Sequence, residues 1–498
     1  MHTRRVAVVG AGIGGLVAAL ELAARGFEVV VLEQAQAPGG KMRETPIAAA
    51  RIDAGPTVLT MRWVFDEIFA TAGAVVSDHL ELRRAEVLAR HAWSGTERLD
   101  LYADLGRSAD AIGAFAGAGE ARRFLEFSAR ARTVYRTLEG PFIRSARPSP
   151  LGLTRTAGMK GLGDLWRISP FTTLWRALGQ HFHDPRLRQL FGRYATYCGS
   201  SPFQAPATLM LVAHVEQEGV WLVEGGMHRI ALALATLATA RGATFRYGAE
   251  VAEVVTHGER ATGLRLASGE HIDADAVIVN ADVAAVAAGR LGAGIAPAAT
   301  PLAPGARSLS AVTWAVAART EGFPLQRHNV FFSRDYPAEF EAIFQRGQIP
   351  AEPTVYVCAQ DRGDSEIATT SGPERLLCLV NAPALGDVRA FDANEINRAE
   401  EHAFGVLARC GLHVDRTQTN CVVTTPADFE RLFPGTGGAL YGRASHGWNA
   451  SFQRADARTR LSGLYLAGGS VHPGPGVPMA ALSGRLAAKA LLEDARAV

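Results

Sequence analysis

The chain has 498 residues, with 51 basic against 49 acidic side chains and a formal net charge of +2. At 48% hydrophobic and 20% charged residues, it has a globular composition of about three structural units, which excludes a disordered, collagen-like or generally basic nucleic-acid-binding chain. Its five cysteines form no C-x-x-C pair, so neither a disulfide framework nor a zinc site is expected. No signal peptide or apolar run of 18 residues is found, so no transmembrane helix is expected.

The first 33 residues have the pattern of a dinucleotide-binding unit. Residues 6–9 are apolar and β-branched, which predicts a buried parallel strand. The glycine motif G-x-G-x-x-G follows at residues 10–15, and residues 16–25 are predicted to form a helix. Residues 27–32 predict a second buried strand that leads to an acid, Glu33. Together the strands, glycine turn, helix and acid favour a bound dinucleotide.

Each part of this unit has a separate physical task. Gly10 permits the tight turn, Gly12 lets the backbone approach a pyrophosphate, and Gly15 lets the helix pack closely on the strand. The N–H groups and positive dipole end of the helix attract phosphate. Glu33 is placed to accept hydrogen bonds from a ribose diol. The predicted binding residues of the unit are Gly10, Gly12, Ile13, Gly14, Gly15, Glu33 and Gln34.

The residues after Glu33 favour FAD over NAD. Gly39 and Gly40 are followed by Lys41 and Arg43, and this arrangement resembles the extended FAD fingerprint of the glutathione-reductase-type flavoproteins. Arg43 can act as a charge-assisted donor to the pyrophosphate, although a solvated surface arginine is the alternative. A turn follows in which backbone can approach a flavin. The predicted cofactor contacts here are Gly40, Lys41, Arg43, Gly55, Pro56 and Thr57.

The C-terminal part repeats the order of strand, glycine-rich turn and helix. Residues 464–467 predict a strand, residues 468–479 a turn rich in Gly and Pro, and residues 480–492 a helix. The N-terminus of this helix is expected to stabilise negative charge on a reduced flavin ring. The predicted contacts are Gly468, Gly469, Val477, Pro478 and Met479. His472 is a candidate base, but a His beside Pro in a tight loop is more often structural.

The middle of the chain completes the predicted fold. A helix over 228–241, strands over 242–247 and from 251, a hairpin over 265–273 and a strand over 276–279 suit an FAD domain, with Val251 near the adenine. The fold class is therefore α/β, with a Rossmann-like FAD-binding domain of the glutathione-reductase type assembled from three segments. A second, α+β substrate domain is expected to include a helical membrane-associating part. The predicted FAD segments are 1–75, 216–285 and 456–498, and the predicted substrate segments are 76–215 and 286–455.

Residues 141–193 combine nine basic side chains with two acids and with interleaved aromatics such as Trp166, Trp175, Phe182 and Phe191. Basic, aromatic, amphipathic stretches are typical of a bilayer surface. The alternative is a solvated helical face on an arginine-rich protein. His181 and His183 have no third ligand nearby, so no metal is expected.

Several motifs together resemble a known family. Residues 53–57, 224–227, 279–282 and 328–333 look like the carotenoid desaturases of the bacterial phytoene-desaturase type. The tail, residues 468–478, is closer to the 1-hydroxycarotenoid 3,4-desaturase branch, which includes hydroxyneurosporene and methoxyneurosporene desaturases. The resemblance extends from residue 6 to about residue 490.

This resemblance implies non-covalent FAD and a flavin amine oxidoreductase fold. It implies that a C3–C4 double bond is introduced into a 1-hydroxy acyclic C40 carotenoid, by hydride transfer to flavin N5 and loss of a proton from the neighbouring carbon. The substrate would come from the membrane, with oxygen or a quinone as electron acceptor. A cytoplasmic protein peripherally bound to the inner membrane is expected. No residue stands out as the obligatory base.

Other functions on the same fold remain open. A phytoene desaturase or a carotenoid isomerase belongs to the same family. A flavin amine oxidase would need an aromatic cage around the amine, which the sequence does not reveal. A non-enzymatic lipid-binding protein, like the GDP-dissociation inhibitors of prenylated GTPases, predicts lost cofactor contacts, whereas Gly10, Gly12, Gly15 and Glu33 are all present.

Overall fold

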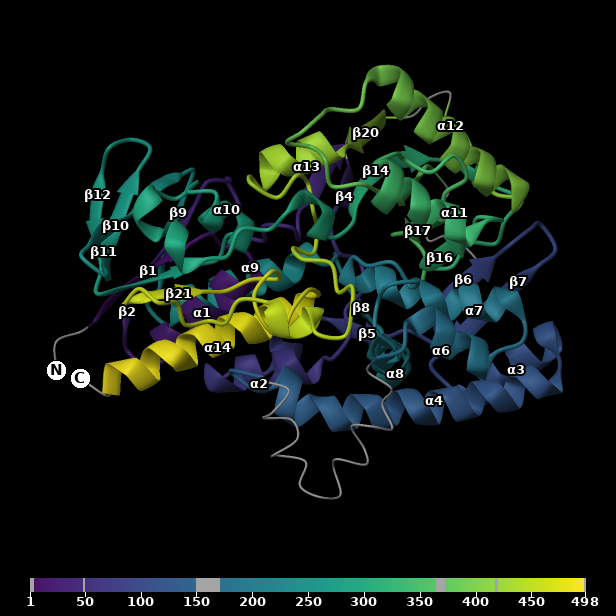
Figure 1. The fold of residues 1–498 in the computed structure, drawn as a ribbon, viewed down its shortest axis with the longest axis horizontal. Helices are drawn as coiled ribbons and strands as arrows, with labels where there is room; N and C mark the ends of the chain where they lie inside the picture. The colour runs from purple at the N-terminus through teal and green to yellow at the C-terminus, as the bar shows by residue number, and fades with distance from the viewer. Residues whose placement is uncertain (1–3, 48–49, 149–170, 364–371, 417–419, 497–498) are drawn as a thin grey trace.

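The computed structural model describes residues 4–47, 50–148, 171–363, 372–416 and 420–496. Two sheets organise this part of the chain (Figure 1). The first is a parallel sheet of the order β21-β13-β1-β2-β9. Its strands are β1 (Arg5–Val9), β2 (Glu28–Glu33), β9 (Thr244–Tyr247), β13 (Ala276–Val279) and β21 (Leu464–Leu466). They come from all three predicted FAD segments.

Both faces of this sheet are covered, as its continuous apolar strands predict. On one face Val6 and Val8 pack against helices α1 (Ile13–Ala23), α2 (Trp63–Thr71), α9 (His228–Ala240) and α14 (Val477–Arg496). On the other face Ala7 and Val9 pack against the antiparallel strands β10 (Val251–His257), β11 (Arg260–Leu266) and β12 (His271–Asp273). This two-sided burial fixes the sheet and so positions the turns at the carboxyl ends of its strands.

The second sheet has the order β20-β14-β18-β17-β16-β6-β7 and is mostly antiparallel. Its strands are β6 (Val87–Ala92), β7 (Arg98–Tyr102), β14 (Ser310–Ala318), β16 (His328–Phe331), β17 (Val355–Ala359), β18 (Glu374–Ala382) and β20 (Asn420–Thr424). Trp314 and neighbouring side chains pack on one face against α12 (Ala393–Arg409). In Figure 1 this sheet and α12 lie beside the parallel sheet.

A helical layer lies below the second sheet in Figure 1. It contains α3 (Leu105–Ala116), α4 (Ala118–Leu138), α6 (Leu174–His181), α7 (Pro185–Gly192) and α8 (Leu211–Glu218), which share one apolar core. The remaining elements are β3 (Glu44–Ile47), β4 (Ala50–Asp53), β5 (Leu82–Arg84), β8 (Trp221–Val223), β15 (Thr320–Glu321), β19 (His413–Val414), α10 (Val283–Ala287), α11 (Tyr336–Glu341) and α13 (Pro426–Leu432). Among the described residues, no helix is long and apolar enough to cross a membrane.

The predicted α/β fold class with its parallel sheet is confirmed, and the helical membrane-associating part stays a prediction. Two helix starts were wrong. Helix α1 begins at Ile13 instead of residue 16, and α14 begins at Val477 instead of residue 480. Both helices start inside the glycine-rich motif, because Gly12 already has extended backbone and serves as the N-cap of α1. The helix N-termini therefore lie closer to the predicted cofactor than the sequence suggested.

The predicted surface over 141–193 is wrong for its C-terminal part. Phe182 and Phe191 are buried and pack on Phe127 of α4. Arg193 is buried too, and Arg186 forms ion pairs with Asp184 and Glu97. These aromatic side chains lie on the buried faces of their helices. The spacing of side chains on a buried helix face is the same as on a membrane-facing helix, so the sequence pattern does not distinguish the two. Trp166 lies outside the described residues.

Candidate functional site

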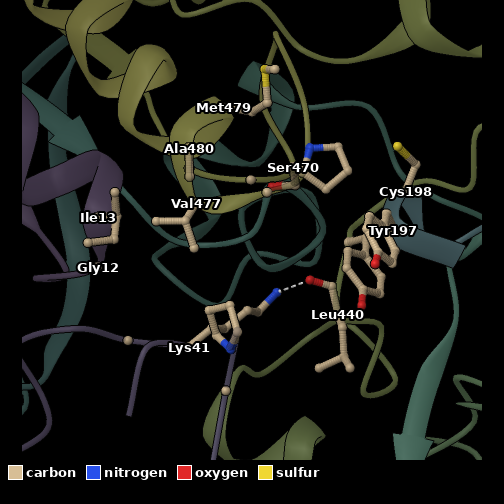
Figure 2. Close-up of a pocket in the computed structure, with 18 of the residues that line it drawn as sticks. Gly12, Ile13, Lys41, Tyr197, Cys198, Leu440, Ser470, Val477, Met479 and Ala480 are labelled. Atoms are coloured by element: carbon tan, nitrogen blue, oxygen red, sulfur yellow. Dashed lines mark hydrogen bonds between the residues drawn. The ribbon is translucent and has the colours of Figure 1, made fainter. Parts of the chain in front are cut away.

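A cavity of about 1090 Å³ lies between the two sheets. It exceeds the roughly 300–1,000 Å³ typical of small-molecule sites. Its wall contains residues of all three predicted FAD segments together with residues of the seven-stranded sheet and the helical layer. Figure 2 shows part of this wall, with Gly12 and Ile13 of α1, Val477 and Ala480 of α14, and Tyr197.

The glycine motif forms one end of the cavity. Gly10 has a φ of +92°, a left-handed conformation that favours glycine. A Cβ on Gly12 would lie 2.7 Å from Nδ2 of Asn280, so the close approach of these two segments favours a residue without a side chain at position 12. No side chain caps the N-terminus of α1, so its first N–H groups are left for a ligand. Gly15 does not line the cavity. A Cβ there would overlap the Gly10 carbonyl oxygen, which confirms its expected helix–strand packing role.

Glu33 is held in place by the backbone around it. One carboxylate oxygen accepts from the Ala11 N–H at 2.7 Å and the other from the Ala35 N–H at 2.8 Å. The residue is buried at the end of β2 and lines the cavity. Each carboxylate oxygen keeps further acceptor capacity. This arrangement provides the acceptor that a ribose diol needs, next to the glycine turn.

The turn at Gly55 is fixed by Asp53. Its carboxylate accepts from the N–H groups of Met227 and His228 at 2.8 and 3.3 Å, which ties the turn to the start of α9. Its backbone forms two hydrogen bonds with the Gln360 side chain, at 3.0 and 2.9 Å. Burial raises the pKa of Asp53, and the two backbone donors oppose this effect. Asp53 thus connects both sheets beside the cavity.

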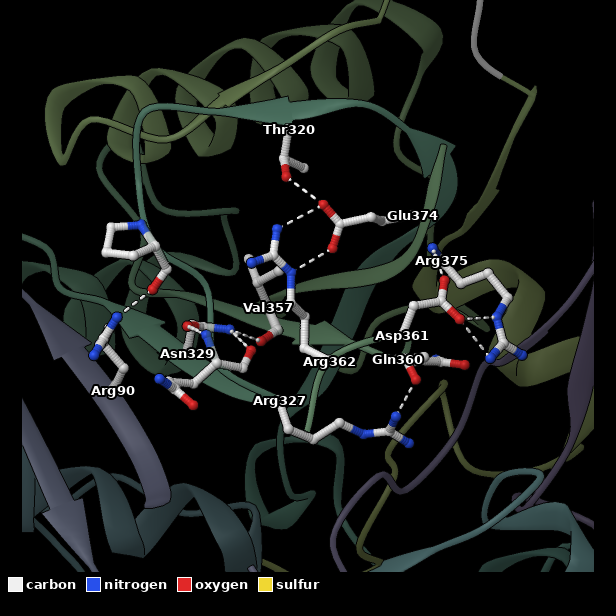
Figure 3. Close-up of polar contacts among 12 residues, drawn as sticks. Arg90, Thr320, Arg327, Asn329, Val357, Gln360, Asp361, Arg362, Glu374 and Arg375 are labelled. Carbon is white, nitrogen blue, oxygen red and sulfur yellow. Dashed lines mark hydrogen bonds and ion pairs between the residues drawn. The ribbon is translucent and has the colours of Figure 1, made fainter. Parts of the chain in front are cut away.

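A second polar network holds this edge of the seven-stranded sheet. Figure 3 shows Arg327 donating to the Gln360 carbonyl and Arg375 paired with Asp361. Arg375 also donates to the backbone of Arg51 in β4 at 3.1 Å. The Gly55 turn and the substrate-side sheet are therefore held in one fixed relation.

Lys41 and Arg43 line the cavity but already have partners. Lys41 donates to the Leu440 carbonyl at 2.8 Å (Figure 2), and burial lowers its pKa against the opposing charge of Asp282. Arg43 donates to Thr45 and Thr424 and lies over the ring of Phe429. A direct contact of Arg43 with a pyrophosphate stays a prediction.

The C-terminal turn meets the glycine motif closely. A Cβ on Gly14 would lie 2.8 Å from the Gly468 nitrogen and 3.1 Å from the Ala480 oxygen. The Ser483 hydroxyl accepts from the Gly468 N–H at 2.7 Å. His472 does not line the cavity: Nε2 lies 2.9 Å from the Ser145 carbonyl, and burial lowers the pKa to about 4. These contacts give His472 a structural position, and we do not propose it as a base.

The sequence therefore located most of the cofactor end of the cavity. Every predicted contact except Gly15 lines it, as the following do: Gly10, Gly12, Ile13, Gly14, Glu33, Gln34, Gly40, Lys41, Arg43, Gly55, Pro56, Thr57, Val251, Gly468, Gly469, Val477, Pro478 and Met479. Bare glycine backbone, two helix N-termini and an acid at the end of β2 fit the phosphates and ribose of FAD. Glycine at these positions lets the three segments approach one another closely around the cavity, because a Cβ on Gly12 or Gly14 would lie less than 3.0 Å from Asn280.

Sequence reasoning missed the polar residues on the opposite wall. Arg193, Tyr197 and Glu216 line the cavity, and so do Tyr356 and Glu339 of the substrate side. They come from separate elements, and only Arg193 belonged to a segment singled out earlier, as part of a surface. No local signal in the sequence marked Glu216, because its helix also contains His214, Gln217 and Glu218.

Residues 13–492 match the family of flavin containing amine oxidoreductases, and the chain belongs to this family. The expected resemblance to carotenoid desaturases is also confirmed. The chain is 58% identical to a hydroxyneurosporene desaturase of Rubrivivax gelatinosus, over 99% of this chain and 94% of that protein. It is 30% identical to a 1-hydroxycarotenoid 3,4-desaturase of Flavobacterium sp. (strain P99-3), over 97% of this chain and 98% of that protein.

Solved structures share the fold at low sequence identity. Putrescine oxidase, solved with putrescine bound, superposes with a TM-score of 0.60 and 16% identity, over 99% of each chain. The match concerns the arrangement of the two sheets and their helices. It does not extend to the substrate.

Proposed function

We propose that the chain is an FAD-dependent carotenoid desaturase that introduces the C3–C4 double bond into a 1-hydroxylated acyclic C40 carotenoid. The observation that carries this proposal is that one cavity joins the glycine cradle to apolar walls of the seven-stranded sheet, including Val330, Leu377 and Leu379. The relative of 58% identity, named for hydroxyneurosporene, supports the substrate class.

The glycine cradle would hold FAD through its phosphates and ribose. Gly10, Gly12 and the N-terminus of α1 would bind the pyrophosphate, and Glu33 the ribose. The Gly55 turn, Gly468 and the start of α14 would surround the ring system. When bound, FAD supplies the two-electron oxidant that takes a hydride from the substrate.

The rest of the cavity would orient the polyene and exclude water. Apolar side chains from β16, β18 and α8 face a channel whose cofactor end is fixed by Asp53 and Gln360. A rigid channel that excludes water would hold one carbon–carbon bond next to the cofactor. Such positioning lowers the activation free energy, because it converts a bimolecular step into an effectively unimolecular one. Desaturation at one defined bond depends on this positioning.

We also propose that the cavity opens toward a membrane surface on the cytoplasmic side. Phe171 and Trp448 line the cavity, yet they are 69% and 47% exposed, and their rings lie 5.4 Å apart. Exposed aromatic side chains at the mouth of an apolar cavity suit the interface of a bilayer, where amphipathic rings are enriched. A carotenoid dissolved in the bilayer would enter the cavity at this pair.

Expression in cells that make a 1-hydroxycarotenoid, and separately in cells that make phytoene, tests the proposed activity. We expect a yellow, flavin-containing protein, and we expect pigment chromatography to show one more conjugated double bond in the hydroxylated carotenoid, with oxygen or a quinone supplied as acceptor. Conversion of phytoene alone would assign the chain to a phytoene desaturase. A colourless protein that takes up no FAD would favour a lipid-binding protein on this fold.

A further inference from the structure

A buried group of charged and phenolic side chains lies on the cavity wall opposite the glycine cradle. It consists of Arg193, Tyr194, Tyr197 and Glu216, which we call the Tyr197 cluster. The hydroxyls of Tyr194 and Tyr197 donate to the two carboxylate oxygens of Glu216 at 2.5 and 2.6 Å. Arg193 donates from Nη2 to the Tyr197 hydroxyl at 2.8 Å.

Burying the charged side chains of the Tyr197 cluster is energetically unfavourable, and a cavity that binds only hydrocarbon does not need them. Arg193 and Glu216 are 7% and 5% exposed, and removing charges from water is unfavourable even when they are paired. Nε of Arg193 and the nearby hydroxyl of Tyr336 are buried with no hydrogen-bond partner among the described residues. Both residues line the cavity, so these unpaired groups are placed where a ligand could meet them.

The protonation states leave one hydrogen-bond acceptor of the Tyr197 cluster without a donor. Burial alone would lower the pKa of Arg193, but Tyr197 and Glu216 outweigh it and raise the pKa, so the guanidinium is charged. Burial raises the pKa of Tyr197, so its hydroxyl keeps its proton and donates it to Glu216. One lone pair of the Tyr197 oxygen accepts from Arg193. The second is left to accept a hydrogen bond from a ligand, because a hydroxyl oxygen has two.

The Tyr197 cluster, apart from Tyr194, lines the same cavity as the turn predicted to meet the flavin. Thr57 of that turn is hydrogen-bonded to the Tyr356 hydroxyl at 2.7 Å, and both residues line the cavity. The pKa of Tyr356 lies well above its ordinary value because of burial first, and Cys358 and Tyr197 raise it further. Tyr197, Tyr356 and Thr57 therefore line the same cavity.

From this geometry we infer that Tyr197, held by Arg193 and Glu216, accepts a hydrogen bond from the tertiary hydroxyl of the carotenoid and so determines the specificity for hydroxylated substrates. The inference rests on the proposed function. In a 1-hydroxycarotenoid the hydroxyl carbon is two bonds from C3, so a group that binds the hydroxyl must lie near the cofactor end of the cavity. The inference places the hydroxyl against Tyr197, which lines the same cavity as the Gly55 turn, whereas an apolar wall would suit an unsubstituted end.

The physical consequence is discrimination against the polyene that lacks the hydroxyl. A buried site built to hydrogen-bond a substrate hydroxyl discriminates against the analogue that lacks the hydroxyl. With that analogue bound, the protein group has neither the substrate nor water as a hydrogen-bond partner. Since Tyr197 has internal partners, we expect a smaller factor than for an unpartnered site, about 10- to 100-fold in kcat/KM.

Tyr194 provides a matched control for Tyr197. Both tyrosines donate to Glu216, but only Tyr197 lines the cavity. Tyr197→Phe and Tyr194→Phe therefore each remove one donor to the same carboxylate. Tyr197→Phe also removes the acceptor of the Arg193 Nη2 donor, so it is expected to lose more stability, and only this variant removes a hydroxyl that lines the cavity.

The test measures kcat/KM of full-length, FAD-loaded protein in lipid vesicles, with a 1-hydroxycarotenoid and with the same polyene lacking the hydroxyl. We expect Tyr197→Phe to lower the wild-type preference for the hydroxylated substrate about tenfold, through that substrate alone, and Tyr194→Phe to leave the preference unchanged. Equal losses on both substrates in Tyr197→Phe, or an unchanged preference, would overturn the inference. If the wild-type protein desaturates neither polyene, the proposed function itself fails.

Discussion

The close packing of α1 on α14 gives the sharpest prediction about the cofactor cradle. Gly484 lies in the buried face of α14 and does not line the cavity. A Cβ on Gly484 would overlap the carbonyl oxygen of Gly14. It would also lie 2.8 Å from the carbonyl carbon of Gly14 and 3.0 Å from the Cα of Gly14. All of these atoms are backbone, so no side chain can rotate away.

The size of the effect follows from these distances. Carbon atoms in contact normally lie about 3.5–4.0 Å apart, and the overlapping carbonyl oxygen needs a larger displacement than the two carbons, so Gly484→Ala requires α14 to move by about 1 Å or more. Overpacking of this kind costs about 1–3 kcal/mol, and replacing glycine inside a helix recovers about 1 kcal/mol. The net loss of folding free energy is therefore expected to reach about 2 kcal/mol. Because both helix N-termini face the cavity, FAD should also bind about tenfold more weakly, the equivalent of about 1.4 kcal/mol.

Gly405→Ala is the control for this variant. Gly405 lies in α12, and a Cβ there would meet nothing within 4 Å. We expect this variant to be stabilised by about 0.5–1 kcal/mol. Urea unfolding and FAD titration of the apoprotein measure both quantities. If Gly484→Ala is as stable as Gly405→Ala and binds FAD like the wild type, the packing argument is wrong.

Three further predictions follow from other contacts. Glu33→Gln places an amide N–H against the Ala11 or Ala35 N–H and should cost about 1–3 kcal/mol in urea unfolding and weaken FAD binding; unchanged values would exclude the role of Glu33. Burial lowers the pKa of His91 and His328 from 6.5 to about 3, so between these pH values the unfolded chain binds more protons than the folded one. The free energy of unfolding therefore falls as the pH drops below 6.5, by up to about 1.4 kcal/mol per pH unit for each histidine. His328→Gln should flatten this dependence in urea midpoints measured from pH 7 to 5, and an identical slope would contradict the burial argument. Replacing Phe171 and Trp448 by Ser should reduce liposome flotation several-fold, whereas Val388→Ser, at a side chain 66% exposed elsewhere, should not; equal flotation of all three proteins would exclude the aromatic mouth.

The cofactor end of the cavity was predictable because its information is local. Gly10 to Gly15 and Glu33 lie within one strand–helix–strand unit, and each residue type has a separate steric or hydrogen-bonding reason. The start of α1 was misplaced because glycine lowers the apparent helix propensity of the first turn, while the bare backbone is what the site needs. Gly15 was assigned to packing, and its overlap with the Gly10 carbonyl explains why.

The polar residues on the wall opposite the glycine motif could not be predicted in the same way. Tyr197, Glu216 and Tyr356 come from a 3-10 turn, a helix and a strand that only the tertiary fold brings together. Phe182 and Phe191 show the opposite error. Their spacing among arginines resembles a membrane-facing helix, yet they pack on α4, because helical periodicity identifies an apolar face without saying what covers it.

The most direct test of the account is a single turnover without oxygen. FAD-loaded wild-type protein is mixed with a 1-hydroxycarotenoid in lipid vesicles, and flavin absorbance and the polyene spectrum are followed together. We predict that one flavin is reduced for each carotenoid that gains one conjugated double bond. A flavin that stays oxidised while it remains bound, with an unchanged polyene spectrum, would contradict the proposal that this cavity brings FAD and a hydroxylated carotenoid together.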